Sequence, residues 1–460
     1  MKYENLNQFK DSFSSYTELR VQENRNNRVN LTNGDVTGNI ATTTSGVSAR
    51  VFKDGNWGFS SSPNINQESI VNVVNASTEN VQFMNKKDST RCGYFLPETQ
   101  ANYNIDFTTN KDRMQQKYWV DFIREIDGYI EKKYPELLSR NLIIGELDME
   151  KSLFTSDGSE SYSMTPRALL YVMLSIEKAG NPISIGNPWG GLGQLEDKFL
   201  NPSDFYLEID TLVEKLKQKS NGIYADAGQK DVILDADLAG ILAHEAIGHT
   251  TEADLVMGGS IAGNYIDQQI ASPLVTLIDY ANSCNGKTCP VPVYIDDEGT
   301  KSEDVIIIEN GILKKFMHNK DSARHFEEKP TGNARAYQFS DEPLIRMRNT
   351  AFVPGEHTLE EMIASIDDGY YLVKTGNGQA DSTSEFMFAI TMGYEIKNGK
   401  LGKAIKDTTI SGVAFDVLKT VDMISSDMSW SSAGMCGKKQ LIPVGMGGPA
   451  IKCKVNIGGR

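Results

Sequence analysis

The first half of the chain alternates between runs with the two-residue period of a β-strand and runs with the spacing of an amphipathic helix. The pair Asp54-Gly55 stands between aromatic and aliphatic positions and predicts a tight hairpin turn. Strands are expected at residues 16–21, 28–31, 46–51, 142–151 and 167–177. Helices are expected at residues 67–80, 111–133 and 204–220, where apolar residues recur three and four positions apart.

The second half of the chain is richer in strand patterns. The apolar run 305–313 is interrupted by Asn310-Gly311, which predicts a hairpin. Apolar and polar residues alternate over 386–394, before another turn at Asn398-Gly399. We therefore expect a large antiparallel sheet in this half.

Together these patterns predict an α+β fold with two domains. Residues 1–227 are expected to form an N-terminal domain of antiparallel hairpins and helices, and residues 228–460 a β-rich C-terminal domain. The polar stretch from about 85 to 109 reads as a loop or an insertion, in which Cys92 has no ligand partner nearby. The glycine-rich residues 189–195 predict a tight turn, because they lack the preceding strand and the lysine of a phosphate-binding loop.

One segment, residues 244–254 (HEAIGHTTEAD), concentrates ionisable side chains in a chain with five histidines. Neutral imidazole is the commonest protein ligand for zinc, so His244 and His249 are candidate ligands. Glu245 stands beside the first histidine, where a carboxylate can deprotonate a zinc-bound water. The segment therefore predicts a zinc site and hydrolytic chemistry.

The two histidines are five positions apart, whereas the common HExxH motif separates them by four. At about 100° per residue the two rings would diverge by roughly 140° on an ideal α-helix, too far to share one ion. One extra residue in a π-type turn closes this angle, and such turns favour functional sites. Gly248 is the residue of the motif that best tolerates the strain. We therefore expect a π-type turn here.

The residues before the motif favour a buried position over a surface helix. Residues 232–234 predict a short core strand, and Asp235 or Asp237 can cap a following helix. Apolar positions within 238–242 supply the stripe that packs this helix, and Gly258-Gly259 offer a stop. The alternative is an ordinary surface helix with unmetallated histidines and solvated carboxylates. A helix that follows a core strand and carries a polar cluster favours the metal site.

The motif supplies two ligands, and zinc sites need at least three from the protein. Cys436 is the best candidate for the third, because it lies among small residues before a glycine-dense segment. Spacing alone does not separate it from Cys453. His318 and His325 are fallback candidates, although each is more readily explained as a structural histidine.

Composition and charge argue against several classes of protein. The chain has a formal net charge of −15 and no basic run, which argues against direct nucleic-acid binding. No apolar run approaches the length of a membrane span, and the N-terminus has no signal-like segment. Five cysteines form no paired framework, and Cys284 and Cys289 are expected to be unpaired loop thiols. We therefore expect a cytoplasmic protein.

The motif and several other segments resemble those of the TldD/PmbA metallopeptidases, once called modulators of DNA gyrase. The resemblance is dense from about residue 231 to 460, weaker before residue 60, and least good from about 85 to 200. Besides the motif, the similar segments are residues 297–300 (DEGT), 308–313 (IENGIL), 331–335 (TGNAR), 346–350 (RMRNT) and 434–438 (GMCGK).

The resemblance implies a zinc ion held by His244, His249 and Cys436, with Glu245 as the general base. It also implies an α+β fold and dimers, either homodimers or heterodimers with a related family member, enclosing a cavity that unfolded or small peptides enter. Because the full ligand set is present, the chain resembles the catalytic TldD type. A thiolate ligand weakens the Lewis acidity of zinc, so modest turnover is expected.

Other interpretations remain open at this point. The zinc could be structural, with a fourth protein ligand, or the chain could be a non-catalytic peptide-binding subunit. It could also be a zinc amidase for a small molecule. Glu252 and Asp254 could orient the ligand imidazoles or be surface charges on the same helix.

Overall fold

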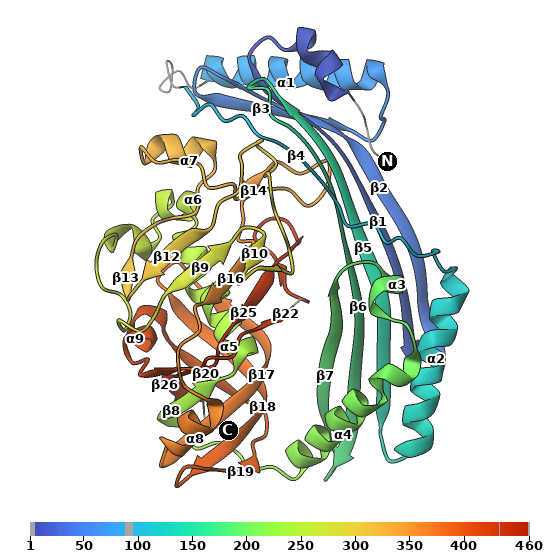
Figure 1. Cartoon of the computed structure of the whole chain (residues 1–460), viewed down its shortest axis with the longest axis vertical. Helices are drawn as coiled ribbons and strands as arrows, with labels where there is room; N and C mark the ends of the chain where they lie inside the picture. Colours follow the sequence, from blue (N-terminus) through green and yellow to red (C-terminus); the bar gives the residue numbers. More distant parts are fainter. Residues whose placement is uncertain (1–4, 88–94, 432, 459–460) are drawn as a thin grey trace.

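The computed structural model describes residues 5–87, 95–431 and 433–458. A long, curved sheet forms one side of the molecule, and a second body of shorter strands and helices lies against it (Figure 1). The long sheet has the order β3-β2-β1-β5-β6-β4, and β7 also pairs with β6. Its strands are β1 (Tyr16–Thr32), β2 (Asp35–Lys53), β3 (Asn56–Ser62), β4 (Asn102–Asp106), β5 (Ser139–Thr155), β6 (Glu160–Lys178) and β7 (Asn181–Leu192).

Two of these strands are longer than the sequence pattern predicts. The three short strands expected between residues 16 and 51 are two continuous strands, β1 and β2, which pair from Tyr16↔Phe52 to Thr32↔Asp35. The polar middle of β1 has no apolar alternation, yet β1 pairs without interruption with β5 on its other side. Main-chain hydrogen bonds to two neighbours therefore extend the strand where the side chains give no signal. The predicted hairpin at Asp54-Gly55 is confirmed between β2 and β3.

Helices cover the long sheet at both ends. α1 packs on β2 and β3, while α2 and α4 lie along the outer face of β5 and β6 (Figure 1). The three predicted helices are confirmed, although α1 continues beyond residue 80 and α2 starts later than expected. The helices of this half are α1 (Gln67–Lys87), α2 (Gln116–Lys133), α3 (Leu195–Lys198) and α4 (Tyr206–Ser220).

Two predictions of irregular structure need correction. The polar stretch 85–109 is irregular at 95–101 and 107–109, but α1 extends into it and 102–106 form β4, a parallel neighbour of β6; Cys92 lies outside the described residues. The glycine-rich stretch 189–195 is not a tight turn, because its first part continues β7 as far as Leu192. Gly190 has a φ of +121°, and a Cβ there would lie 2.0 Å from the carbonyl oxygen of Ala168. This glycine therefore lets β7 pass close to β6.

β8 (Gly228–Leu234) is the first strand that pairs outside the long sheet, and it begins a second, closed sheet. This change of sheet supports a division of the chain near residue 227, which stays a proposal. The second sheet runs β17-β8-β26-β20-β18-β19, β17 also pairs with β18, and β21 pairs with β26. Its other strands are β17 (Asp368–Ala380), β18 (Glu385–Lys397), β19 (Lys400–Ala404), β20 (Thr408–Val413), β21 (Met423–Ile424) and β26 (Ile451–Ile457).

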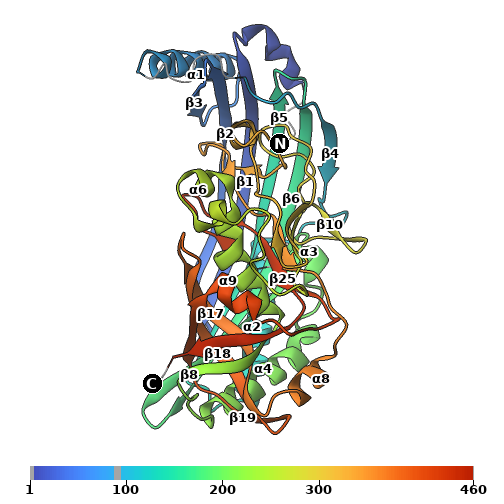
Figure 2. The ribbon, with the colours of Figure 1, turned by 90° about the vertical axis from the view of Figure 1, so that its left-hand side faces the viewer.

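A third sheet, of order β13-β12-β9-β16-β25-β22, lies above it (Figures 1 and 2). The hairpins at Asn310-Gly311 and Asn398-Gly399 are confirmed. The single antiparallel sheet expected here was wrong: β8 with β17 and β16 with β25 are parallel pairs, because these partners come from distant parts of the chain. The strands are β9 (Leu277–Tyr280), β12 (Val305–Glu309), β13 (Ile312–Leu313), β16 (Asn349–Phe352), β22 (Ser429–Ser431) and β25 (Gly445–Gly448).

Short elements complete this body. The helices are α5 (Ala236–Ile241), α6 (Ala253–Met257), α7 (Lys320–His325), α8 (Leu359–Ala364) and α9 (Ala414–Lys419). The two-residue strands are β10 (Ser283–Cys284), β11 (Lys287–Thr288), β14 (Ala334–Arg335), β15 (Leu344–Ile345), β23 (Met435–Cys436) and β24 (Ile442–Pro443). None of the described helices is long and apolar enough to cross a membrane.

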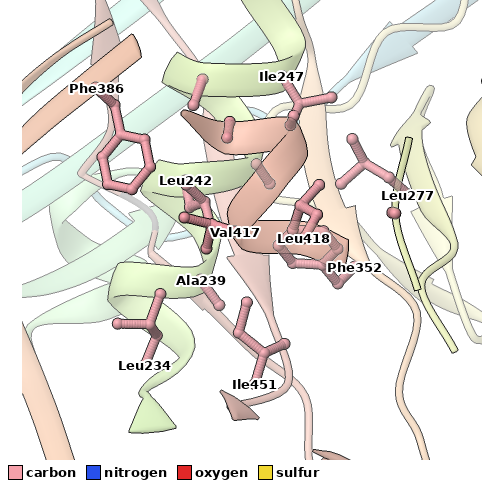
Figure 3. Packing of buried hydrophobic residues seen from close by; sticks show 14 of the residues in the cluster. Leu234, Ala239, Leu242, Ile247, Leu277, Phe352, Phe386, Val417, Leu418 and Ile451 are labelled. Atoms are coloured by element: carbon pink, nitrogen blue, oxygen red, sulfur yellow. The ribbon is translucent and has the colours of Figure 1, made fainter. Parts of the chain in front are cut away.

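The hydrophobic core of this second body surrounds the helix of the histidine motif. Leu242 and Ile247 of that helix contact side chains from the closed sheet, from β16 and from α9, among them Phe386, Phe352 and Leu418 (Figure 3). All of these side chains are almost completely removed from solvent. The motif helix is therefore fixed on several sides by apolar packing, which makes the positions of its polar side chains well defined.

Candidate metal centre

The motif begins where a core strand ends. The Asp235 carboxylate accepts a hydrogen bond from the backbone N–H of Ala236 at 2.8 Å and caps α5. Asp235 is one of the two capping residues that the sequence predicted. The helix then widens into a π-helical segment, Leu242–Gly248, followed by one 3₁₀ turn, His249–Thr251. The predicted π-type turn is therefore confirmed.

The widened turn brings the two histidines together. Their ring centroids are 5.1 Å apart and their planes are inclined by 77°. His244 is fully buried, while about a fifth of the His249 side chain is exposed. A five-residue spacing therefore places both imidazoles on one side of this helix, which an ideal α-helix does not do.

The reason for a glycine at position 248 differs from the one predicted. Gly248 has φ −56° and ψ −54°, an ordinary helical conformation without backbone strain. A Cβ at this position would lie 2.0 Å from the Sδ atom of Met347 and 3.2 Å from the carbonyl oxygen of Ala243. The glycine therefore provides space for Met347 to pack against the motif.

Replacing Gly248 with Ala tests this explanation. Because Met347 is fully buried, its side chain has little room to move away from the added methyl group. We expect a destabilisation of about 1–3 kcal/mol, the usual cost of overpacking a core. Thermal unfolding of the wild type, Gly248→Ala, Met347→Ala and the double variant measures it. Gly248→Ala should cost less stability in the Met347→Ala background than in the wild type; an equal cost in both backgrounds would show that the backbone at residue 248 is the cause.

The third predicted ligand comes from the other end of the chain. Cys436 lies on β23, which pairs with β24, and its Sγ atom is 3.3 Å from Nε2 of His249. Ligand atoms of His244, His249 and Cys436 all lie within 4.8 Å of one another. The structure therefore brings together the three residues that the sequence singled out.

The alternative ligands lie elsewhere. Cys453 is on β26 and belongs to the apolar core. His318 contacts the hydroxyl of Ser322 through Nδ1, and burial lowers its pKa to about 4. His325 ends α7. In the described parts of the chain, none of these side chains belongs to the cluster of three.

His244 supplies the observation that tests whether this cluster suits a metal. Both of its ring nitrogens are buried, and neither has a hydrogen-bond partner among the residues that the structure describes. A buried polar atom without a partner is costly, and nearly all such atoms in proteins are satisfied. Imidazole nitrogens and thiolate sulfurs are both usual ligands for zinc, and three protein ligands leave a fourth position open. The donor set therefore fits a zinc ion.

The electrostatics of the cluster favour a thiolate. Burial raises the pKa of the Cys436 thiol, but the two neighbouring imidazoles outweigh it and lower that pKa to about 4. Burial also opposes protonation of His249, whereas the Glu252 carboxylate and Cys436 raise its pKa well above the usual value. The free cluster is therefore a thiolate–imidazolium arrangement, whose protons must leave when a metal binds.

Glu252 and Asp254 occupy different positions around the cluster. Glu252 is fully buried, and its Oε2 atom is 2.8 Å from Nδ1 of His249 and 3.2 Å from Nζ of Lys438. This contact orients the imidazole so that Nε2 faces Cys436. Asp254 is more exposed and binds Lys438 at 2.7 Å; it contacts neither imidazole within the described residues. Through Lys438, both carboxylates tie the cysteine loop to the motif helix.

Arginine side chains that the sequence analysis assigned no role also hold the cysteine loop. The buried guanidinium of Arg346 donates to the carbonyl oxygens of Cys436 at 2.8 Å, Lys438 at 3.0 Å and Gln440 at 2.9 Å. Arg335 donates to the carbonyl oxygen of Pro443 at 2.8 Å. The sequence did carry a signal for Arg346, which stands two positions before Arg348 in an apolar, strand-like segment. A cation buried in such a segment needs oxygen atoms as hydrogen-bond partners.

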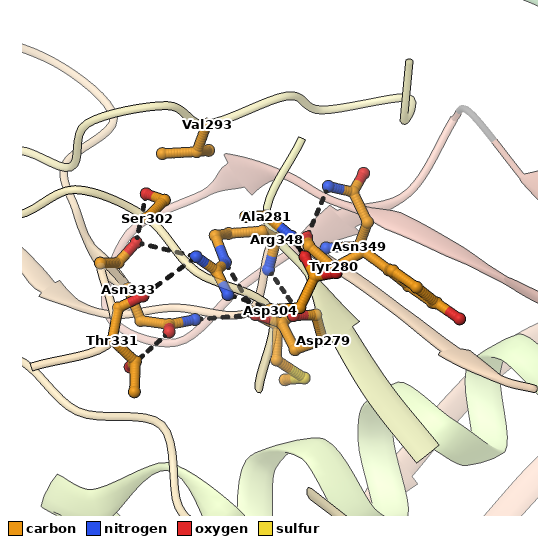
Figure 4. Close-up of polar contacts among 12 residues, drawn as sticks. Asp279, Tyr280, Ala281, Val293, Ser302, Asp304, Thr331, Asn333, Arg348 and Asn349 are labelled. Atoms are coloured by element: carbon orange, nitrogen blue, oxygen red, sulfur yellow. Dashed lines mark hydrogen bonds and ion pairs between the residues drawn. The ribbon is translucent and has the colours of Figure 1, made fainter. Parts of the chain in front are cut away.

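A second polar network fixes the segment that carries Arg346 (Figure 4). Arg348 and Asp279 form an ion pair of 2.9 Å with both side chains fully buried. Asp279 also accepts the backbone N–H groups of Arg348 and Asn349 and the side-chain amide of Asn333. The guanidinium of Arg348 donates to the carbonyl oxygen of Glu303 at 2.7 Å. One carboxylate therefore joins several loops of this body.

Glu245, the candidate general base, is the last residue of the predicted site. It follows His244 in the π-helical segment, and its Oε2 atom is 3.7 Å from Nε2 of His249. About a quarter of its side chain is exposed, and it makes no hydrogen bond to any residue that the structure describes. Its carboxylate is thus directed to the cluster and accessible to solvent, unlike that of Glu252.

Comparison with known proteins places the chain in a family. Models for the PmbA/TldA metallopeptidase domain 1 and C-terminal domain match residues 17–81 and 227–459. A zinc metalloprotease TldD homolog from Saccharolobus solfataricus is 29% identical over 90% of both chains. A metalloprotease TldD homolog from Buchnera aphidicola is 35% identical over 73% of this chain and 74% of that protein.

Solved structures share the fold. TldE from Thermococcus kodakarensis superimposes with a TM-score of 0.77 at 17% identity, covering 99% of each chain. A Thermotoga maritima protein superimposes with a TM-score of 0.79 at 21% identity, covering 96% of each chain. The α+β fold is therefore that of known relatives over almost the whole length. With the matches to both family models, the chain belongs to the PmbA/TldD metallopeptidase family.

Proposed function

We propose that this chain is a zinc-dependent peptidase that hydrolyses unfolded or small peptides. The observation that supports it most directly is His244: its two nitrogens are buried and unpartnered in the described structure, beside His249, Cys436 and an accessible Glu245. When bound there, zinc supplies a positive charge that polarises a scissile carbonyl and makes a water molecule more acidic.

The side chains around the site have distinct tasks in this proposal. His244, His249 and Cys436 hold the metal, and Glu252 keeps Nδ1 of His249 occupied so that Nε2 faces the ion. Glu245 accepts a proton from water during attack and returns it to the leaving amine. Lys438 neutralises Glu252 and Asp254, whose charges would otherwise lie next to the thiolate loop.

The surroundings of the motif helix suit an extended substrate. A cleft of about 390 Å³ lies between β6 and β7 on one side and α5 and β17 on the other. Ile241 lines this cleft and precedes Glu245 by four residues, about one helical turn. A cleft between two layers of structure admits an unfolded chain more readily than a folded domain.

The dimer implied by the resemblance, with a second copy or with a related chain, and the cytoplasmic location remain parts of the proposal.

Removing and restoring zinc tests the proposed function. The protein is stripped with a chelator, reloaded with one equivalent of zinc, and incubated with a mixture of unstructured peptides whose products are identified by mass spectrometry. We expect cleavage by the loaded protein, none by the stripped protein, and recovery on reloading. Sedimentation velocity of the loaded protein gives its oligomeric state in the same buffer.

The same experiment separates the other interpretations. Zinc bound at one equivalent without any products would contradict a stand-alone peptidase and favour a structural metal or a missing partner chain. Cleavage that survives complete removal of zinc would contradict the metal mechanism itself.

A further inference from the structure

One face of β6 lies against the second body, and its side chains line two cavities. Ser163, Thr165 and Arg167 on this face line a cavity of about 80 Å³, together with residues 291–297. Farther along the same face, Tyr171 lines the cleft of about 390 Å³ beside the motif helix. Because alternate residues of a strand share a face, the two cavities follow one another along β6.

Arg167 is the charged residue of this face that is nearest to the cysteine loop. Its side chain is 5% exposed, and its Nη1 atom donates to the carbonyl oxygen of Gly434 at 3.2 Å. Its Nε and Nη2 atoms are buried and have no hydrogen-bond partner in the part of the chain that the structure describes. Burial alone lowers the pKa of Arg167, to about 10. The guanidinium therefore presents two unused donors without a carboxylate partner.

The carboxylates in the same cavity are already engaged. Asp297 binds Lys151 at 2.7 Å and also accepts the backbone N–H of Ala336. Asp296 accepts three backbone N–H groups, at 2.9 to 3.0 Å. Neither is paired with Arg167, so an anion that enters the cavity meets a guanidinium whose Nε and Nη2 donors have no partner among the described residues.

The distance of Arg167 from the metal ligands determines which part of a bound peptide it can contact. Gly434 is two residues before Cys436, and an extended chain advances by about 3.3–3.6 Å per residue. A group bound to Arg167 is therefore within a few residues' length of a peptide bond at the metal site. The cavity is large enough for a carboxylate, since one water needs roughly 10–15 Å³ of such space.

We propose that Arg167 binds the C-terminal carboxylate of the peptide substrate, so that the protein cleaves bonds close to a free C-terminus. The proposal rests on the proposed peptidase function and specifies its substrate class. Arginine is suited to this role because its fixed pair of N–H donors matches the two oxygens of a carboxylate.

Matched pairs of peptides test the proposal. The probes are alanine-rich pentapeptides that end in a free carboxylate or in a carboxamide, and a third that combines the carboxamide with a Glu side chain. We expect kcat/KM of the wild type to favour the free acid by 10- to 100-fold. Arg167→Gln should abolish the preference, so that the ratio of kcat/KM for the free acid to that for the carboxamide falls to within threefold of one. Arg124→Gln, on the exposed surface of α2, is the matched control.

Binding is measured separately from cleavage. Fluorescently labelled forms of the same peptides are titrated into zinc-loaded Glu245→Gln protein, with and without Arg167→Gln, so the preference is visible even if cleavage fails. Arg167→Lys keeps the charge and should keep part of the preference. If the wild type binds and cleaves acid and amide equally, or if Arg167→Gln lowers both alike, Arg167 only clamps the cysteine loop and the proposal is wrong. Preference for the Glu-containing amide would assign the site to acidic side chains instead and overturn the C-terminal assignment.

Discussion

Replacing Glu245 with Gln is expected to lower kcat for peptide cleavage by roughly 10²- to 10⁴-fold while zinc stays bound. Glutamine keeps the shape of the side chain but cannot take a proton from water. Glu245 is also the accessible carboxylate at the cluster, because Glu252 is fully buried and committed to His249 and Lys438. A loss in kcat with little change in KM would show that the missing interaction acts in the transition state.

Three measurements accompany this variant. Metal analysis checks that the zinc content equals that of the wild type, and thermal unfolding checks that the fold is intact. Glu245→Asp keeps the carboxylate but withdraws it by one methylene, so a partial loss of rate is expected. Glu309→Gln, on the exposed side of β12, controls for the removal of a negative charge elsewhere. Full activity of Glu245→Gln would assign proton transfer to another group; loss of zinc would make Glu245 a ligand.

The part of the site that the sequence predicted depends on local spacing. The five-residue interval between His244 and His249 required an extra residue in the helix, and the structure contains a π-helical segment there. Asp235 as one of two candidate caps and the buried core strand before it were also local inferences. These inferences succeeded because, in a helix, the number of residues between two positions sets the directions in which their side chains point. Cys436 was chosen on glycine density, a weaker argument, and its proximity to the histidines depends on the fold.

The part that the sequence did not predict depends on contacts between distant segments. Nothing local shows that Arg346 binds the carbonyl oxygens of the Cys436 loop, or that Lys438 joins that loop to Glu252. The parallel pairing of β8 with β17 likewise joins segments more than one hundred residues apart. The polar centre of β1 is a strand because of its neighbours and not because of its side chains. Strand type and sheet order are therefore properties of the assembled fold.

The metal ligands are held by two different kinds of interaction. The histidines belong to a helix that is packed in the largest apolar core, where Leu242 and Ile247 are fully buried (Figure 3). The cysteine lies on β23, which Arg346 and Lys438 hold together with a small apolar cluster that includes Ile442 and Val444. The large core packs the histidine helix on several sides, whereas the cysteine segment has only a small apolar cluster and depends also on a few charged side chains. Mutations in the polar network should therefore move Cys436 more readily than the histidines.

The polar network makes Asp279→Asn the substitution with the largest expected effect on stability. The variant leaves the guanidinium of Arg348 fully buried without its carboxylate, and it places an amide N–H₂ among donors that now share one oxygen (Figure 4). Breaking one partner of a buried ion pair costs about 3–5 kcal/mol. For a body of this size that corresponds to a fall in Tm of roughly 6–20 °C.

An exposed ion pair provides the matched control. Asp368 on β17 binds Lys397 and Lys230 with about half of its side chain exposed, so Asp368→Asn removes the same chemical group from a solvated site. Such pairs contribute about 0–1 kcal/mol, so we expect a fall in Tm of at most about 4 °C. Calorimetry of both variants measures the difference. Equal shifts would show that the Asp279–Arg348 pair adds nothing beyond an ordinary surface contact. A large shift confined to Asp279→Asn, with weaker zinc binding, would show that this pair also supports the segment through which Arg346 holds the Cys436 loop.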